Sequence, residues 1–294
     1  MSSTLPILSI CIPTFNRKNG IISLLQSIDN NKDIEVVIID DGSTDDLKKA
    51  INYKQFDLNI KFRKTINRGR SSALSDAIKL SSGQFIMIMD SDDYFIPKGI
   101  DSIIKEINLN QGIKCFLFGV DINKNNFFKK NLPPKNLKAN LLKLRADFNI
   151  KGDMKEVVSS EIIKKCIYKK CYQFRRTPTS LIWECVSRNI DCLTINKCVV
   201  VKNFDDFGLT AKISNIKYEN PEPMFDLYKQ YYFSNLYKSK LFRMRSKIQF
   251  YRYLFITKKN LDIRFEDIFF ILLGFTLSHF DRWKYFYKNK IISK

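Results

Sequence analysis

The sequence predicts an α/β fold in which a mostly parallel sheet is flanked by helices and followed by a mainly helical, basic C-terminal extension. Over the first 120 residues, short runs rich in β-branched residues alternate with helix-like stretches, and polar residues follow each run. Beyond about residue 220 the composition becomes strongly basic and aromatic. With 294 residues, 45% of them hydrophobic, the chain can form a substantial core, which excludes a wholly disordered protein.

Four strands and three helices are expected in the first 120 residues. Each predicted strand is a short apolar run that ends in a polar loop, and the four runs are residues 8–13, 35–40, 60–64 and 85–90. The predicted helices carry apolar residues at helical spacing, at residues 20–28, 45–51 and 71–80. Ser43 or Thr44 is expected to cap the second helix. In such a sheet, ligands bind beyond the carboxyl ends of the strands.

Aspartates gather at two of these strand ends. Asp40 and Asp41 end the second run, and Asp90, Asp92 and Asp93 end the fourth. Neighbouring carboxylates repel each other unless a cation or hydrogen-bond donors compensate, so this pattern indicates a divalent metal site. Mg²⁺ or Mn²⁺ typically keeps one or two protein carboxylates and takes its other ligands from water and substrate phosphates, so a nucleoside diphosphate is the expected third component.

Net charge narrows the possible partners. Fifty Lys and Arg residues against 30 Asp and Glu residues give a formal net charge of +20, which leaves nucleic acid, acidic lipid and phosphorylated substrates open as anionic partners. The single histidine, His279, excludes a catalytic histidine dyad and a metal site built from several histidines.

The seven cysteines are an odd number without a CxxC pair, so they are expected to be reduced thiols in the cytoplasm. Four of them are expected to be small buried hydrophobic residues rather than zinc ligands, namely Cys166, Cys171, Cys185 and Cys192. The N-terminal apolar stretch is short and broken by prolines, so it does not resemble a signal peptide. No apolar run reaches the roughly 18 residues of a membrane-spanning helix.

The last 70 residues form a compositional unit. Residues 225–294 hold fifteen basic and five acidic residues and 20 of the 39 aromatic residues, and a hinge is predicted at residues 217–223. The apolar stretch 268–280 is too short to span a bilayer, and the belt of aromatic and basic residues after it suits the headgroup region of anionic lipid. Peripheral membrane contact is therefore expected, while a helix packed on the first domain, a dimer interface and nucleic-acid binding stay open.

Four segments together resemble the inverting family 2 glycosyltransferases with the GT-A fold. They are LSICIPTFNR, VVIIDDGSTDD, the loop Asn67-Arg68-Gly69, and GQFIMIMDSDDYFIP, in this order. The resemblance covers residues 5–120. It implies a catalytic domain at residues 1–220, with a nucleotide-sugar-binding half at 1–120 and an acceptor half at 121–220. The helical, basic and aromatic region at residues 221–294 follows it, and its composition is the reason to expect membrane contact.

The resemblance also implies how the donor is held. Phe15 corresponds to the aromatic residue that stacks on the nucleotide base. Asp41 corresponds to the carboxylate that reads the imide N–H of the base, which favours a uridine or thymidine nucleotide, and Pro13 supplies backbone contacts in the same wall.

Asp90 and Asp92 correspond to the family's DxD pair, with Asp90 towards the ribose and Asp92 on the Mn²⁺ or Mg²⁺ ion that bridges the diphosphate. Asp93 is expected to support them, and Arg68 or Arg70 to approach phosphate. A cation and a guanidinium would stabilise the negative charge of the leaving diphosphate.

An inverting transfer also needs a general base, usually an Asp or Glu on the acceptor side. Related enzymes often carry an acidic residue where this chain has Thr179. The nearest carboxylate to that position is Glu184, directly after Trp183. We therefore expect Glu184 to be the general base, with Asp153 and Glu156 as alternatives. Glu184 could instead pair with Arg188 one helical turn later.

These features predict a metal-dependent inverting glycosyltransferase, of the hexosyl or N-acetylhexosaminyl type. Its donor would be a nucleotide sugar, preferably a UDP-sugar, and its acceptor a glycan or lipid-linked molecule at the inner face of the membrane, as in bacterial surface polysaccharide synthesis. The competing hypothesis is a basic nucleic-acid-binding protein without transfer activity, although acidic strand ends would repel that ligand. A nicotinamide dehydrogenase is excluded because no GxGxxG follows a strand.

Overall fold

One sheet of ten strands organises the computed structural model, which describes residues 5–29, 31–51, 56–124, 127–203, 217–260 and 264–292. The strands found in these residues are β1 (Leu8–Thr14), β2 (Ile34–Asp40), β3 (Ile60–Lys64), β4 (Phe85–Ile88), β5 (Tyr94–Phe95), β6 (Cys115–Lys124), β7 (Phe127–Asn131), β8 (Lys138–Ala139), β9 (Lys155–Ser159) and β10 (Cys192–Asn203). Their order across the sheet is β3-β2-β1-β4-β9-β6-β10-β5, with β7 paired to β6 and β8 to β10.

The strand directions confirm the predicted α/β sheet and the parallel pairing of its first four strands, but the sheet as a whole is mixed, because β5, β7, β8 and β9 pair antiparallel to their neighbours. Strands β3, β2, β1 and β4 are mutually parallel, and β6 is parallel to β10. Strand β9 lies between β4 and β6 and is antiparallel to both. The four runs predicted from the sequence form β1 to β4 with small shifts at their ends. All residues of β1 and β2 are buried, as expected for strands covered on both faces.

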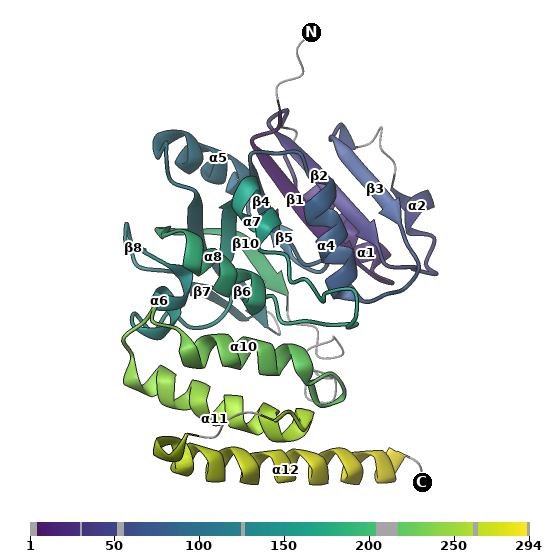
Figure 1. Cartoon of the computed structure of the whole chain (residues 1–294). Helices are drawn as coiled ribbons and strands as arrows, with labels where there is room; N and C mark the ends of the chain where they lie inside the picture. The colour runs from purple at the N-terminus through teal and green to yellow at the C-terminus, as the bar shows by residue number, and fades with distance from the viewer. Residues whose placement is uncertain are drawn as a thin grey trace.

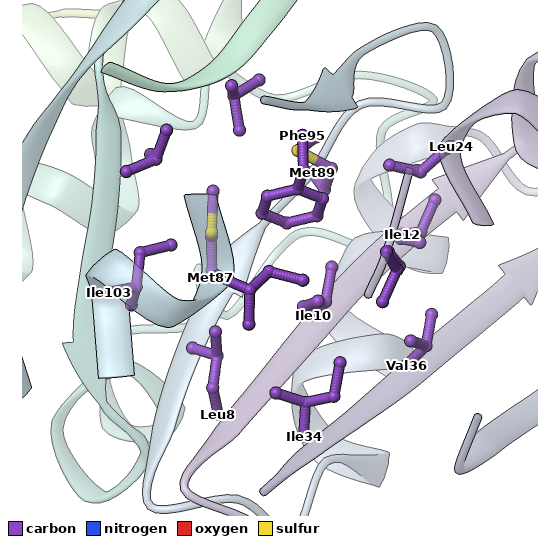
Figure 2. Packing of buried hydrophobic residues seen from close by; sticks show 14 of the residues in the cluster. Leu8, Ile10, Ile12, Leu24, Ile34, Val36, Met87, Met89, Phe95 and Ile103 are labelled. Carbon is purple, nitrogen blue, oxygen red and sulfur yellow. The ribbon is translucent and has the colours of Figure 1, made fainter. Parts of the chain in front are cut away.

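Helices cover both faces of the sheet (Figure 1). On one face lie α1 (Lys18–Gln26), α2 (Leu47–Ala50) and α5 (Gly99–Leu109), whose apolar residues share a core with one side of β1 and β2. Figure 2 shows Leu24 of α1 and Ile103 of α5 in this core with Ile10 of β1. On the other face lie α4 (Arg70–Leu80), α6 (Leu141–Ala146), α7 (Ser160–Lys165) and α8 (Ser180–Asn189).

The prediction that Ser43 or Thr44 caps the second helix is wrong. Helix α2 begins after Asp46, and no side chain caps it. The Ser43 hydroxyl accepts a hydrogen bond from the backbone N–H of Asn16 instead, and the Thr44 N–H donates to the Asn16 side chain, both over 2.8 Å. These two residues therefore tie the loop after β2 to the loop after β1, because the parallel neighbours end side by side.

The prediction that all seven cysteines are reduced is also wrong. Cys166, which follows α7, forms a disulfide with Cys185 of α8, with 5.4 Å between their Cα atoms. The two short helices pack against each other, which brings the side chains within bonding reach. Cys171 and Cys192 are buried free thiols, as expected.

Three helices and a short turn of 3₁₀ helix follow the sheet and lie in a separate layer beside it: α10 (Glu222–Phe233), α11 (Lys240–Thr257), η1 (Phe265–Asp267) and α12 (Ile268–Ile292) (Figure 1). Their aromatic residues form a third core, to which Leu181 of α8 contributes. Helices α11 and α12 approach closely at Gly274 of α12, where a Cβ atom would stand 2.6 Å from the Cβ of Tyr251. Within the segments described above, no helix has both the length and the apolar character to cross a membrane.

Candidate active site

The acidic loop after β4 lies at the carboxyl edge of the parallel strands. A turn closes it, in which the Asp93 N–H donates to the Asp90 carbonyl over 3.2 Å. Helix α1 packs directly on this loop, because a Cβ atom on Gly20 would stand 2.4 Å from the carbonyl oxygen of Ser91. The loop is therefore held between α1 and the sheet.

Three cations neutralise much of the charge in this loop. The Arg70 guanidinium lies 2.6 Å from an Asp90 carboxylate oxygen, and the Lys155 ammonium lies 2.9 Å from Asp93. The Lys202 ammonium, at the end of β10, lies 3.3 Å from Asp90, 3.8 Å from Asp93 and 3.3 Å from Asp153. Although burial raises the pKa of Asp90, these cations hold it well below its usual range.

The sequence analysis missed Lys155 and Lys202. Each is a largely buried lysine close to a run of valines, in the segment KEVVS for Lys155 and CVVVK for Lys202. A charged residue inside a buried strand is a signal that it has a partner. The partner itself could not be predicted, because it lies 62 residues away for Lys155 and 112 residues away for Lys202.

Asp92 lies in a different electrostatic setting. Burial raises its pKa, and so do the neighbouring charges of Asp93 and Asp90, while Arg17 lowers it by less. One carboxylate oxygen of Asp93 is buried without a hydrogen-bond partner among the residues that the structure describes. Crowded carboxylate oxygens with incomplete compensation fit a hard divalent cation.

The protein alone does not supply a complete metal shell in the described segments, which contain no cluster of three or more His, Cys, Asp or Glu side chains suited to a metal ion. A cation bound by Asp92 would take its remaining ligands from water and from a diphosphate, as Mg²⁺ commonly does. The donor set therefore fits Mg²⁺ or Mn²⁺ in the presence of a nucleotide.

The residues expected to hold the nucleotide base follow β1 and β2. Pro13 is buried in β1, whereas the Phe15 side chain just beyond it is 45% exposed and accessible for stacking. The Asp41 carboxylate accepts hydrogen bonds of 2.8 Å from the backbone N–H groups of Arg68 and Gly69. Burial nevertheless raises the pKa of Asp41. Asp41 thus orders the loop that leads into α4.

This loop separates the two candidate arginines. The Arg68 guanidinium pairs with Asp76 over 2.8 Å on the outer side of α4, whereas Arg70 reaches Asp90. Gly69 between them has a φ of +97°, and a Cβ atom there would stand 2.2 Å from the carbonyl oxygen of Arg175. The structure therefore brings Arg70, and not Arg68, to the acidic loop.

A cavity of about 610 Å³ opens beside Asp90. It reaches from the strand ends to α8, α10 and α11, and Asp90, Asp153, Glu156 and Glu184 are its acidic lining residues. Pro13, Phe15, Asp41 and Asp92 do not line it. The structure thus brings Asp90 and all three candidates for the general base to one cavity. It leaves outside that cavity both the residues expected to bind the nucleotide base and Asp92, the expected metal ligand.

The three candidates for the general base pair with different cations. Glu184 is buried, and its carboxylate lies 2.7 Å from the Arg188 guanidinium, which confirms the expected pairing. Burial raises the pKa of Glu184 and Arg188 partly lowers it. Burial likewise raises the pKa of Glu156, whose carboxylate lies 3.3 Å from Arg145. Asp153 pairs with Lys202.

Comparison with known proteins agrees with this geometry. The sequence model of the family described as "Glycosyl transferase family 2" matches residues 9–163. Over 109 residues the chain is 29% identical to the GalNAc(5)-diNAcBac-PP-undecaprenol beta-1,3-glucosyltransferase of Campylobacter jejuni, covering 35% of each chain. The alignments with the curated relatives span between 12% and 35% of the lengths of those relatives.

Solved structures share the fold. S. aureus TarS 1–349 in complex with UDP-GlcNAc has a TM-score of 0.63 at 15% identity, covering 91% of this chain and 79% of TarS 1–349. The mannosyltransferase PcManGT of Pyrobaculum calidifontis, in complex with GDP-Man and Mn²⁺, has a TM-score of 0.50 at 14% identity, covering 98% and 86%. At these identities the likeness extends to the GT-A fold alone, whereas the family match spans more than half of the sequence. The chain belongs to glycosyl transferase family 2.

Proposed function

We propose that the protein is an inverting glycosyltransferase that moves a sugar from a UDP-sugar, with Mn²⁺ or Mg²⁺, to a glycan or lipid-linked acceptor. One observation carries this proposal: Asp90, Arg70 and Lys202 meet at the edge of a cavity that three further carboxylates line. The TarS structure with UDP-GlcNAc supports the donor class, and the undecaprenol-linked substrate in the name of the Campylobacter relative supports the acceptor class.

In the proposed binding mode, the nucleotide base stacks on Phe15 beside Asp41, and the diphosphate lies at Asp90 and Asp92. When bound, the cation neutralises the developing charge of the diphosphate. The guanidinium of Arg70 adds a fixed positive charge at the same place, and it is held there by Asp90 before the donor arrives.

The proposed transfer is a single displacement. A carboxylate takes the proton of the acceptor hydroxyl, the hydroxyl oxygen attacks the anomeric carbon, and the bond from that carbon to the diphosphate oxygen breaks. We assign the base to Glu184, because burial raises its pKa while Arg188, its cation partner among the described residues, is half exposed. Asp153 is the weaker candidate because Lys202 neutralises it, and Glu156 is the other alternative.

The C-terminal helices at residues 221–294 are proposed to rest on an anionic membrane surface at the cytoplasmic face. Their outermost helix, α12, exposes large apolar side chains along one side, including Phe269, Leu272 and Trp283. A catalytic domain at residues 1–220 would then face acceptors that are anchored in the same membrane.

Thermal unfolding with UDP, with and without Mn²⁺, tests the function. A ligand that binds only the folded state raises the melting temperature, so UDP with Mn²⁺ should raise it by several degrees and UDP alone by less. Asp92→Asn should remove the metal-dependent part and keep the melting temperature of the free protein. Asp191→Asn, an exposed change of the same chemistry, should behave as the wild type. No shift with any nucleoside diphosphate would rule the proposal out.

A further inference from the structure

Two cations in the cavity have no ion pair with an acidic residue in the described part of the chain. Six basic side chains from the described residues line this cavity: Arg70, Arg145, Lys155, Arg176, Lys202 and Lys217. Four of these pair with the acidic lining residues or with Asp93. The structure shows no hydrogen bond or ion pair from a described residue to Arg176 or Lys217, and the Nη1 atom of Arg176 is buried without a partner.

Burial and neighbouring positive charges disfavour the charged forms of Arg176 and Lys217. Burial lowers the pKa of Arg176, and so does the positive charge of Arg70, while the charge of Asp90 raises it by less. Burial also lowers the pKa of Lys217, as do the charges of Arg176 and Arg252. Unpaired charges in a partly buried site are unfavourable, and an anion placed among them would remove both the desolvation cost and the repulsion.

The backbone holds Arg176 in this position. On one side, Arg175 packs against Gly69, and its guanidinium donates to the Asn67 side chain over 2.7 Å. On the other side, the Thr177 N–H donates to the Ser71 hydroxyl over 2.5 Å. The segment is thus fastened to the start of α4 at both flanks, which fixes the backbone of Arg176 beside the cavity.

Lys217 is held from the other end of the cavity. Its neighbour Tyr218 stacks on Tyr285 of α12, with 4.6 Å between the ring centroids. Lys217 also lines a second cavity, of about 820 Å³, which shares Tyr228, Tyr231 and Phe242 with the first. This second cavity lies among α10, α11 and α12, and aromatic and basic side chains dominate its wall.

We propose that Arg176 and Lys217 form a phosphate-binding subsite for the acceptor, which rests on the proposed transferase function. The acceptor would carry a phosphate or diphosphate at these cations and extend its remaining part into the second cavity. Asp90 and Arg70, which the proposed donor binding mode uses, also line this cavity, but Phe15, Asp41 and Asp92 lie outside it. The donor is therefore the poorer occupant of the part of the cavity that residues of α8, α10 and α11 line.

Two acceptor classes have this chemistry: a lipid diphosphate, whose chain would enter the aromatic cavity, and a polyol-phosphate polymer. Farnesyl diphosphate and glycerol phosphate are soluble probes of the two. Their binding is measured by calorimetry to the full chain, to Arg176→Gln and to Lys217→Met, with Lys165→Gln as an exposed control of equal charge change. UDP with Mn²⁺ is titrated into the same four proteins as an independent measure of donor binding.

We expect at least one probe to bind the wild type and the control, and to bind each cavity variant about tenfold to a hundredfold more weakly, with UDP affinity unchanged. The preferred probe identifies the acceptor class. Because each variant removes an unpaired cation, its melting temperature should equal or exceed that of the wild type.

The subsite is overturned if neither probe binds, or if both variants bind the probes as the wild type does. It is also overturned if the variants lose as much affinity for UDP as for the probes, because that result would assign the two cations to donor binding. Failure of UDP to bind the wild type, with probe binding intact, would count against the transferase function and not against the anion site.

Discussion

Single residues determine how charge is distributed in the cavity. The sequence was sufficient to predict that Asp90, Asp92 and Asp93 gather at a strand end, because their place after an apolar run is a local property. It could not separate Arg68 from Arg70, since their directions depend on Gly69 and on the packing of Arg175 against it. The sequence also did not indicate that Lys202, in the distant strand β10, contacts the carboxylates of Asp90 and Asp93 in this loop.

Substitution of a single carboxylate can identify the general base of the proposed transfer. If Glu184 is the base, Glu184→Gln should lower kcat by about a hundredfold to ten-thousandfold, because the acceptor proton loses its carrier. The fold should survive, since Arg188 is half exposed and can be solvated without its partner. Asp153→Asn and Glu156→Gln should lower kcat less. Steady-state rates with a saturating donor, together with melting temperatures, measure both effects.

A pH profile distinguishes a base from a structural residue. The base must be ionised, so kcat falls as the pH drops through the raised pKa of Glu184. Arg188 lowers that pKa, so Arg188→Gln should raise it further and move the acidic limb of the profile to higher pH. A full rate in Glu184→Gln, or an acidic limb that does not move in Arg188→Gln, would transfer the role to Glu156 or Asp153.

At the scale of elements, the first four strands were predictable and the antiparallel insertion was not. Strands β1 to β4 are separated by helices, and that alternation dictates parallel neighbours. Strand β9 has only five residues, KEVVS, two of them charged, and its place between β4 and β6 depends on pairing across about 70 residues of chain. Nothing local in the sequence marks that position.

Glu35 illustrates how a buried charge joins elements. It lies in β2 with an exposed fraction of zero, and it accepts hydrogen bonds from Ser9 of β1 and from Ser82 in the loop before β4. The Lys61 ammonium of β3 lies 2.7 Å away. Burial by itself raises the pKa of Glu35, but Lys61, Ser9 and Ser82 lower it to about 2.

Glu35→Gln should therefore destabilise the fold by about 2 kcal/mol at neutral pH, because the ion pair and charge-assisted hydrogen bonds are lost. A depressed carboxyl pKa stabilises the folded state above the ordinary pKa and loses that contribution as the pH falls towards the folded value. The difference between the two proteins in urea unfolding should thus be constant above about pH 5 and shrink below it. Glu161→Gln, at an exposed pair with Lys165, should show no measurable change. Equal stability of wild type and Glu35→Gln at pH 7 would refute the role of this network.

The whole molecule combines a sheet domain with a layer of helices. The inner side of this layer forms an aromatic core, whereas its outer side exposes apolar side chains of α12. Composition alone indicated a basic and aromatic unit near residue 220, but not which of its rings would be buried. Phe250 and Tyr251 of α11 enter the third core, and Asp267 is buried there, where it accepts hydrogen bonds from Tyr232 and Tyr251 and pairs with Lys247. That distinction follows from helix packing, which leaves the opposite side of α12 uncovered.

The uncovered side of α12 leads to a prediction about membrane binding. Phe269 and Leu272 are 57% and 61% exposed, one turn apart on the outermost helix of Figure 1. If this side inserts between headgroups, the double change Phe269→Ser and Leu272→Ser should weaken binding to vesicles containing phosphatidylglycerol by about tenfold for each side chain. High salt should weaken the wild type as well, because basic residues attract the anionic surface.

Because both side chains are exposed, the double variant should keep the wild-type melting temperature and UDP affinity, so a loss of vesicle binding cannot be ascribed to unfolding. Ile66→Ser supplies the matched control, since Ile66 is an apolar residue that is 77% exposed in the loop after β3, on the sheet domain. Co-sedimentation with vesicles of graded anionic content measures all three proteins. If the double variant sediments as the wild type does, or if Ile66→Ser reduces binding equally, the apolar side of α12 is not the membrane contact, and acceptors must reach the cavity by another route.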